Sequence, residues 1–451
     1  MVGMRRALDR AADGNGRGKA GDARGGEGPT LPGHLHLECC PDRFRKCAAC
    51  HFPGGLAPFS LLDYADAKKR ASSIAAVTQK GLMPPWLAAP GYGDFVGESE
   101  RRLDKQELRT IQEWVKRGAL EGKSLRPAVR PKIFPMAARP PGPHSQAVAP
   151  LHPSRAWTRR QERDAQLRHS RPGPEDAIRE GARISPPGLD RKLFFHANVL
   201  YDPTGLSRLH EGQGDQPGFM SMNLEIESDR FDPEGHFPLW KPGTAPAAEI
   251  DGMPWRLRKG SDLVLNMHMI PDGKPHKIQP TVGLCFTDKP PTKHPILIEL
   301  HNTQAINIPP GDKHFVVTDQ VTLPLDVEVF AVYPHAHYLG KDLEGYAILP
   351  GGEKKWLLRI PGWNTEWSAV FRYVKPVFLP KGTVVHMHFV YDNSSGNPRN
   401  QSHPPKRVVG GDQATNEMAE FWLQVLPVNW QNLPVDPRLV LQETMMRHDV
   451  E

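Results

Sequence analysis

The chain has 451 residues, of which 38% are hydrophobic, and it carries 57 Lys and Arg against 51 Asp and Glu. This length and apolar content predict two or three domains with cores of their own. No run of about 18 apolar residues occurs, so we expect no membrane-spanning helix, and five cysteines are too few for a disulfide-built scaffold. The positive charge is concentrated in residues 1–46 (net +3) and 124–190 (net +6), while the remainder sums to −3. A folded basic face, and with it nucleic-acid binding, is therefore not expected.

The first 123 residues divide into two segments of different character. Residues 1–40 are rich in Gly, Arg, Asp and Ala without a hydrophobic period, so we predict a disordered N-terminus with no visible secretory signal. Residues 41–123 predict a compact helical unit, with one helix over 61–80. A second helix should begin at Asp104, which forms a capping-box pattern with Glu107, and should end at Gly118.

A c-type haem attachment motif, Cys47-Ala-Ala-Cys50-His51, stands near the start of the helical unit. Two thiols one helical turn apart can add to the two haem vinyl groups, and the adjacent His51 can then reach the iron. Met83, in Gly-Leu-Met-Pro-Pro-Trp, is the candidate sixth ligand, since a thioether opposite histidine raises the haem potential. The alternatives are a zinc or thiol pair for the cysteines, although no second pair at zinc spacing follows, and a core methionine beside Trp86.

Residues 44–123 resemble a cytochrome c-like domain through the segments CAACH, PFSLLDY, RAS, MPPW, GYGDF and IQEWVKRGALEG. The resemblance implies haem c as a cofactor. It also implies a periplasmic or otherwise extracytoplasmic location, because haem is attached there in bacteria.

Residues 124–190 hold twelve Pro and eleven Arg and have no hydrophobic period, so we predict a linker or a disordered segment. One hypothesis is that this segment and residues 1–40 are translated from a shifted reading frame, since aperiodic Arg- and Pro-rich sequence adjoins well-patterned sequence. Resequencing the gene tests the hypothesis, and ordered structure in this segment would count against it.

From Lys192 onward, short alternating or apolar runs are separated by Gly, Pro, Asn and Asp, which is typical of β-sandwiches and jelly rolls. The runs are Leu193–Leu200, Asp262–Met269, Thr281–Phe286, Phe315–Thr322, Val327–Val332, Trp356–Ile360, Val384–Tyr391 and Glu420–Leu426. We therefore predict a mainly β fold, in which jelly-roll-like β-sandwiches are preceded by a small all-α cytochrome c-like domain. The sandwiches are expected over 191–322 and 323–430, with a tail over 431–451.

A pair of histidines, in Tyr333-Pro-His335-Ala-His337, has the spacing of a metal site on a strand, because residues i and i+2 face the same side. Imidazole ligands suit copper or zinc, and a thioether as third ligand would favour copper. Met418, in Asn-Glu-Met-Ala-Glu, is the candidate for that third ligand. The alternative is two exposed or hydrogen-bonded histidines. A second such pair, His386 and His388, is predicted to be structural or exposed.

Residues from about 192 to 428 resemble the copper type II, ascorbate-dependent monooxygenases, a family that includes peptidylglycine α-hydroxylating monooxygenase and dopamine β-monooxygenase. The carrying segments are Phe195-His196-Ala-Asn-Val, Asp262-Leu-Val-Leu-Asn-Met-His268, Pro-His335-Ala-His337-Tyr-Leu-Gly-Lys341 and Asn416-Glu-Met418. The resemblance implies two jelly-roll sandwiches, each holding one copper ion. The first copper stores an electron and has three histidine ligands. The second has two histidines and one methionine, matched here by His335, His337 and Met418, and it binds dioxygen.

The electron-storing copper is matched less completely. His268 corresponds to its distal histidine and His196 to the second histidine of an adjacent pair, whose first position is Phe195 in this chain. Phenylalanine cannot bind a metal, so two matched ligands remain. The other candidates for the third ligand are His210, His236 and His276, although their spacing does not favour any of them. The alternative is that His196 and His268 are ordinary strand histidines.

These observations predict a copper-dependent monooxygenase that hydroxylates a C–H bond of a small-molecule or peptide substrate with dioxygen. Its electrons would come from ascorbate, from the fused haem or from another redox partner. One alternative is a haem and copper electron-transfer or metal-binding protein without hydroxylase activity, since Phe195 and the missing early strands would impair the storage copper. Another is a non-catalytic β-sandwich binding module with vestigial ligands. The number of bound copper ions distinguishes the three.

Overall fold

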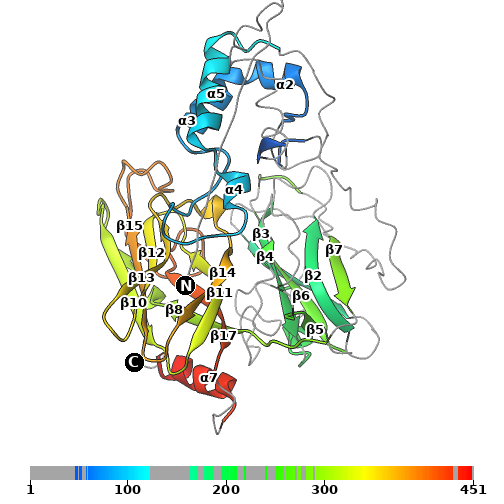
Figure 1. Ribbon diagram of the computed structural model, residues 1–451, viewed down its shortest axis with the longest axis vertical. Coiled ribbons are helices and arrows are strands. Elements are labelled where there is room, and N and C mark those ends of the chain that lie inside the picture. The colour runs from blue at the N-terminus through cyan, green and yellow to red at the C-terminus, as the bar shows by residue number, and fades with distance from the viewer. Residues whose placement is uncertain are drawn as a thin grey trace, which may run out of the picture.

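The computed structural model describes residues 46–48, 50–52, 57, 59–121, 163–170, 177–185, 194–202, 204–210, 218–219, 239–240, 250, 252–257, 260–269, 272–275, 281–287, 290–429 and 435–448. Within these residues the fold is mainly β, and the strands of each sheet pair antiparallel. A helical unit lies at one end of the long axis, and two groups of strands lie beside each other below it (Figure 1). Of the helices in the described residues, none has the length and hydropathy that crossing a bilayer requires.

The helical unit contains α2 (Tyr64–Lys69), α3 (Ala71–Gln79), α4 (Glu98–Arg101) and α5 (Lys105–Lys116). The single helix expected over 61–80 is two helices, because the backbone leaves the helical region at Arg70, whose N–H bonds only three residues back to Ala67. The predicted start of α5 is confirmed: Asp104 and Glu107 form both hydrogen bonds of a capping box. Gly118 follows α5 in a left-handed conformation (φ +82°), as predicted for its end.

The C-terminal strands form two four-stranded sheets, in the orders β10-β15-β12-β13 and β14-β11-β17-β8. The first consists of β10 (Phe315–Thr322), β15 (Val384–Tyr391), β12 (Gly340–Ile348) and β13 (Lys354–Ile360), and the second of β14 (Phe371–Leu379), β11 (Val327–His335), β17 (Glu420–Pro427) and β8 (Ile296–His301). Two short strands, β9 (Asn307–Ile308) and β16 (Val408–Val409), pair beside them. One apolar core takes side chains from both sheets, such as Met387 of the first and Phe421 of the second, so the sheets pack face to face.

The N-terminal strands form a four-stranded sheet, β1-β6-β3-β4, and a three-stranded sheet, β5-β2-β7. Their bounds are β1 (Arg163–Ser170), β2 (Ala177–Ser185), β3 (Phe194–Asp202), β4 (Leu239–Trp240), β5 (Trp255–Leu257), β6 (Asp262–Met269) and β7 (Thr281–Thr287). A small core joins Val199 and Leu265 of the first sheet to Val282 of the second.

Three expected boundaries differ from the structure. Strands β1 and β2 lie within residues 124–190, where no strand pattern is visible in the sequence, and β1 pairs with β6 along its whole length. Ordered strands there count against the shifted-frame hypothesis for this segment. Strands β8 and β10 belong to the C-terminal sheets, so the boundary expected between 322 and 323 falls before Ile296. The expected tail contains α7 (Pro437–His448), whose Leu441 is buried in the C-terminal core. The expectations for residues 1–40 lie outside the described residues.

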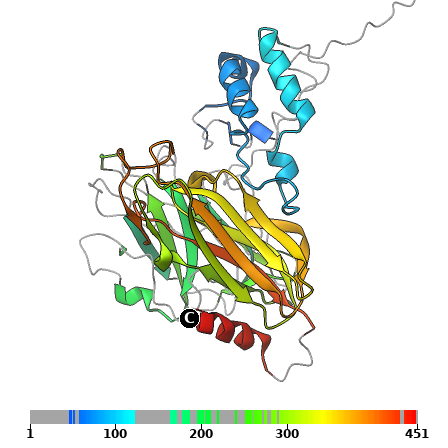
Figure 2. The same cartoon turned by 90° about the vertical axis from the view of Figure 1, so that its left-hand side faces the viewer.

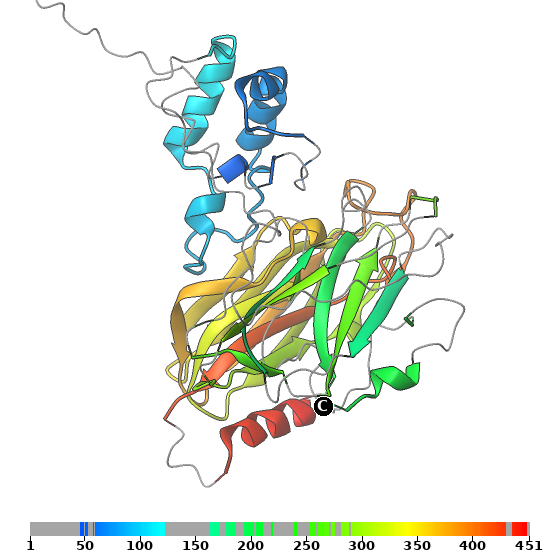
Figure 3. The same ribbon diagram turned by 90° about the vertical axis from the view of Figure 1, so that its right-hand side faces the viewer.

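Residues 86–96, here called the strap, attach the helical unit to the C-terminal sheets (Figure 2, Figure 3). Two backbone hydrogen bonds join the strap to β14: Val96 N–H donates to Arg372 (2.8 Å), and Val374 N–H donates to Asp94 (2.9 Å). Between them, Phe95 enters the core and contacts Phe371 (ring centroids 5.3 Å apart). The strap thus covers an edge of the sheet, where unpaired backbone groups would otherwise remain.

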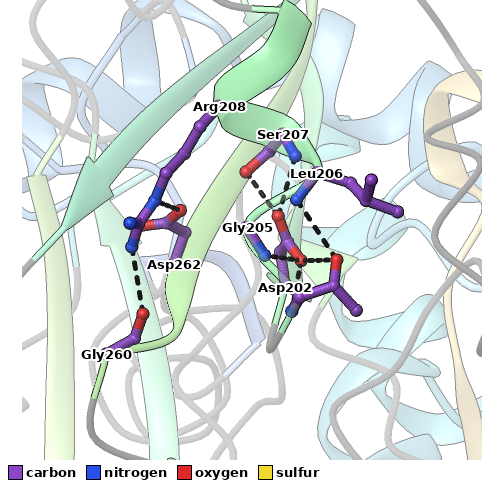
Figure 4. Close-up of polar contacts among 8 residues, drawn as sticks. Asp202, Gly205, Leu206, Ser207, Arg208, Gly260 and Asp262 are labelled. Carbon is purple, nitrogen blue, oxygen red and sulfur yellow. Dashed lines mark hydrogen bonds and ion pairs between the residues drawn. The ribbon is translucent and has the colours of Figure 1, made fainter.

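A carboxylate-centred loop closes the end of the β3–β6 pair (Figure 4). Asp202 and Asp262 stand directly opposite each other in this pair. Asp202 accepts hydrogen bonds from the backbone N–H and hydroxyl groups of Thr204 and Ser207 and from the backbone N–H of Gly205. Asp262 forms an ion pair (2.8 Å) with Arg208, the second residue of α6 (Ser207–His210). Burial alone would raise the pKa of Asp202, but the bonds from Ser207 and Thr204 outweigh it and lower the pKa to about 2.

Candidate metal sites

His335 and His337 lie at the end of β11, on the face of the sheet that points away from the C-terminal core. Strand β11 ends at His335, and Ala336, between the two histidines, belongs to the core. Both histidines are 9% exposed. Their ring centroids are 5.2 Å apart and the ring planes meet at 82°. Because the nitrogen lone pairs of an imidazole lie in the ring plane, an edge-to-face pair allows one nitrogen of each ring to approach a shared ion.

Met418 lies two residues before the neighbouring strand, β17. The β11–β17 pairing ends with His335 opposite Glu420, so His337 and Met418 each lie two residues beyond this last pair. Ala419 and Phe421, the residues that alternate with Met418 and Glu420, enter the core. Met418 is also 9% exposed. The three predicted ligands therefore lie at the same end of two adjacent strands, His335 as the last residue of β11 and His337 and Met418 just beyond the strand ends.

The hydrogen bonds of the two rings bear on which nitrogen can bind a metal. His337 Nδ1 lies 3.0 Å from the carbonyl oxygen of Asn416. A carbonyl can only accept, so Nδ1 carries the proton and Nε2 keeps its lone pair for a ligand. The hydroxyl of Tyr333 lies 3.4 Å from His335 Nδ1. Trp363 Nε1 donates to the backbone carbonyl of His337 (3.0 Å), which fixes the chain that carries the second ring.

Glu417, immediately before Met418, was not among the predicted site residues. Its side chain is 1% exposed, and it accepts hydrogen bonds from the backbone N–H of His337 (2.7 Å, Oε2) and of Leu339 (2.5 Å, Oε1). Burial raises the pKa of Glu417 to about 8, although these bonds favour the charged form. The sequence shows only that Glu417 lies between Asn416 and Met418, and this position does not reveal its hydrogen-bond partners.

His196 and His268, the expected ligands of the storage copper, also lie together but in another geometry. They stand directly opposite each other in the β3–β6 pair. Their rings are stacked, with centroids 3.8 Å apart and planes within 23° of parallel. Lone pairs in near-parallel planes run side by side instead of converging, so one of the rings must turn before both can bind one ion. The side chains of Phe195 and His210, and the whole of His236 and His276, lie outside the described residues.

The second His-x-His pair is separate from these sites. His386 and His388 lie on β15, in the opposite sheet of the C-terminal pair, and Met387 between them enters the core. The two histidines therefore point outward, and His386 stacks on Tyr346 (ring centroids 4.8 Å apart). Within the described residues, no three His, Cys, Asp or Glu side chains come together as a metal site.

The haem-attachment residues form a turn in the helical unit. His51 N–H donates to the Cys47 carbonyl (3.0 Å), and Cys47 and Cys50 form no disulfide within the described residues. Burial raises the pKa of Cys50, and burial lowers the pKa of His51. His51 Nδ1 lies 3.1 Å from the carbonyl of Phe59, which leaves Nε2 for a metal.

Met83 lies in the turn after α3, where its backbone N–H donates to Val77 (3.3 Å). Three residues later, the ring of Trp86 packs edge-on against Phe371 (centroids 5.6 Å apart). These contacts place Met83 where the helical unit passes into the strap. Its role as the sixth haem ligand stays a prediction.

Comparisons with known proteins identify no family. No family model matches the chain, and no curated protein matches it. Among solved structures, that of Sulfolobus Turreted Icosahedral Virus is similar over 67% of this chain and 97% of that chain, at 13% identity and a TM-score of 0.27. The major capsid protein P2 from bacteriophage PM2 is similar over 60% of this chain and 99% of that chain, at 9% identity and a TM-score of 0.23. PNGF-II is similar over 58% of this chain and 59% of that chain, at 11% identity and a TM-score of 0.22. Similarity at this level carries no conclusion about family or function.

Proposed function

We propose that this chain is a copper-dependent monooxygenase that hydroxylates a substrate C–H bond, and that its helical unit is a cytochrome c-like domain. The observation that carries the proposal is the edge-to-face pair of His335 and His337 at the end of β11, at the same end of the sheet where Met418 precedes β17. Two imidazoles and a thioether form a donor set that suits copper, and the bond from His337 to Asn416 leaves Nε2 available. In this proposal both pairs of sheets are jelly-roll sandwiches.

The chain's own groups would hold and orient the copper ligands. Bound copper, changing between its reduced and oxidised forms, would supply the activation of dioxygen and the insertion of one oxygen atom. The Asn416 carbonyl holds the His337 ring by Nδ1, and Trp363 holds the backbone of the same residue. Burial of all three side chains limits their contact with water before substrate arrives.

The haem would supply electrons. Cys47 and Cys50 would attach it, and His51 would bind the iron through Nε2, since Nδ1 is engaged by Phe59. The strap bonds the helical unit to β14, which pairs with β11. This arrangement supports transfer within one molecule of one or both of the electrons that each turnover needs. Ascorbate is the other donor that the family resemblance implies.

One observation favours a second function, that of a haem and copper electron carrier without hydroxylase activity. The stacked rings of His196 and His268 are not arranged for a shared ion, and Phe195 replaces the histidine that the family has beside His196. Without a storage copper, two-electron chemistry would be impaired while the C-terminal copper still bound.

Metal analysis of the full-length, haem-loaded chain tests these alternatives. We expect one haem and two copper ions per chain, with oxygen uptake and hydroxylated product when a reductant and a trial substrate are added. One copper and no uptake would favour the electron carrier. Copper below one ion per chain would reject both. His388→Ala is the matched control, because this histidine lies outward on the opposite sheet and its loss should change neither copper content nor uptake.

A second experiment addresses the electron donor. The chain is prepared with reduced haem and oxidised copper and mixed in a stopped-flow instrument without other reductants. Haem oxidation at a rate that is independent of protein concentration and at least as fast as turnover is expected. Haem that stays reduced on the turnover timescale would reject the haem as donor and leave ascorbate.

A further inference from the structure

We propose that Glu417 is a positioning residue that fixes His337 and Met418 relative to each other, an inference that rests on the proposed function. The geometry points to one buried carboxyl group that bonds to the backbone of His337 and directly precedes Met418 in the chain. Glu417 accepts the N–H of His337 at 2.7 Å and the N–H of Leu339 at 2.5 Å.

The need for this carboxyl group follows from where the strand ladder ends. Regular pairing between β11 and β17 stops at His335 opposite Glu420, before either His337 or Met418 is reached. Beyond that point the buried N–H groups of His337 and Leu339 require acceptors from elsewhere. The two oxygens of Glu417 provide them, one to each N–H. A side chain therefore continues the connection between the two strands across the positions that carry the ligands.

Glu417 is itself held in place by its backbone. Its N–H donates to Val409 (3.1 Å), and its carbonyl accepts from Gly411 (3.1 Å), both in or next to β16. On the other side of Met418, the buried hydroxyl of Tyr391 donates to the Met418 carbonyl (2.7 Å). Since the main chain on both sides of Met418 is fixed, its sulfur can be presented to the same point as the His337 ring. Without Glu417, the segment 336–339 loses two bonds to the residue that precedes the sulfur ligand.

Loss of Glu417 is expected to weaken copper coordination more than it weakens folding. Glu417→Ala should leave the two imidazoles able to bind copper but should loosen the thioether. Loss of a residue that orients metal ligands typically weakens binding about 10- to 100-fold, and we expect Cu(I) affinity to fall in that range. Glu417→Gln keeps one acceptor oxygen and puts an amide NH₂ against the other N–H, so its effect should be in the same direction but smaller.

The experiment compares the full-length, haem-loaded wild type with Glu417→Ala, Glu417→Gln and Gln424→Ala. Gln424 is the matched control, because it is a fully buried polar side chain on β17 that stands opposite Ala331 and not opposite a predicted ligand. Each protein is loaded with Cu(I), its affinity is measured by competition with a chromogenic chelator, and copper X-ray absorption reports the sulfur ligand. Circular dichroism verifies folding.

Weaker binding with reduced sulfur scattering in the folded Glu417 variants, and wild-type values in Gln424→Ala, would support the proposal. Wild-type affinity and sulfur scattering in a folded Glu417→Ala protein would overturn it. If Glu417→Ala does not fold, Glu417→Gln decides by the same two measurements. A wild type that binds copper without sulfur, or binds none, rejects the proposed function itself, and this outcome is visible before any variant is compared.

Discussion

The two histidine pairs proposed to bind copper place the same kind of side chain in different relations. His335 and His337 follow one another at the end of one strand and meet edge to face. His196 and His268 belong to two strands, stand opposite each other and stack face to face. An i, i+2 pair at a strand end can fan its rings around a point, whereas a cross-strand pair within a regular ladder holds its rings nearly parallel. Proximity of two histidines is thus a weaker indication of a metal site than the angle between their rings.

The two histidine pairs also differ in what holds them in place. In the C-terminal pair, Asn416 fixes the ring of His337 and Glu417 fixes its backbone, both from the loop before β17. These contacts hold the ligand in advance of the metal, which lowers the cost of ordering when the metal binds. The N-terminal pair lies within the β3–β6 ladder, where main-chain pairing determines the ring positions. We therefore expect the C-terminal site to be the better prepared of the two.

The largest effect should come from removing a C-terminal ligand. His337→Ala leaves one imidazole and a thioether, and hydroxylation and oxygen uptake should fall by more than about 100-fold, beyond the loss caused by removing a group that only orients a ligand. Oxygen-electrode and product measurements on the copper-loaded chain provide the test, with His386→Ala as control on the outward face of β15. Activity within a few fold of wild type would show that the chemistry lies elsewhere.

The next effect concerns the loop that closes the β3–β6 pair. Asp202→Ala removes a buried carboxylate that accepts five hydrogen bonds and should destabilise the N-terminal strands by about 2 kcal/mol, typical for hydrogen bonds to a charged group. Denaturant titration with fluorescence detection measures this, and copper affinity at the C-terminal site should not change. If Asp202→Ala lowered both the unfolding free energy and the copper affinity at the C-terminal site, the N-terminal and C-terminal sheets would not be independent of each other.

The same carboxylate predicts a pH dependence with a definite sign. Folding lowers the pKa of Asp202 from its usual 3.8 to about 2, so its contribution is fully present above pH 4 and is lost as the pH falls toward 2. As the pH falls through this range, the free energy of unfolding of the wild type should decrease more than that of Asp202→Ala. The difference in unfolding free energy between the two proteins should therefore become smaller. A constant difference from pH 5 to pH 2 would contradict the assigned role.

The sequence was a good guide where local chemistry determined the element. Strands β6, β10 and β15 have the bounds expected from their apolar patterns, and the cap at Asp104 determined the start of α5. The His-x-His spacing also placed both rings on one side of a strand, as the alternation of side chains requires.

The missed strands lack that local signal. β14 contains Pro376, which a strand tolerates at the edge of a sheet, and β12 contains Gly345, where a Cβ would collide with the ring of Phe421. β1 is rich in charged and polar residues and is specified by its pairing with β6. The role of Glu417 was likewise inaccessible, because its partners are about 80 residues away and are joined to it only by the fold.

A smaller effect separates the two proposed copper sites by their affinity for copper. If the stacked rings must reorganise before they bind, copper at His196 and His268 should be held about tenfold more weakly than copper at His335 and His337, a difference in the range caused by poorly oriented ligands. Copper titration with paramagnetic resonance distinguishes the two, since the variant His268→Ala should remove the weaker component alone. Equal affinities would mean that ring stacking has no energetic consequence for the metal.

The smallest expected effect restores a ligand. Phe195→His creates in β3 the adjacent histidine pair of the copper monooxygenases that the sequence resembles, and a third imidazole should raise the copper affinity of the proposed N-terminal site by about tenfold, bringing it near that of the proposed C-terminal site. The matched control carries the same substitution together with His268→Ala, which removes the ligand on the opposite strand. If Phe195→His raises the copper affinity and the added His268→Ala abolishes the increase, all three histidines bind one ion. A gain that persists would instead mean that residue 195 and His196 bind copper without β6, and the storage site would then not depend on the cross-strand pair at all.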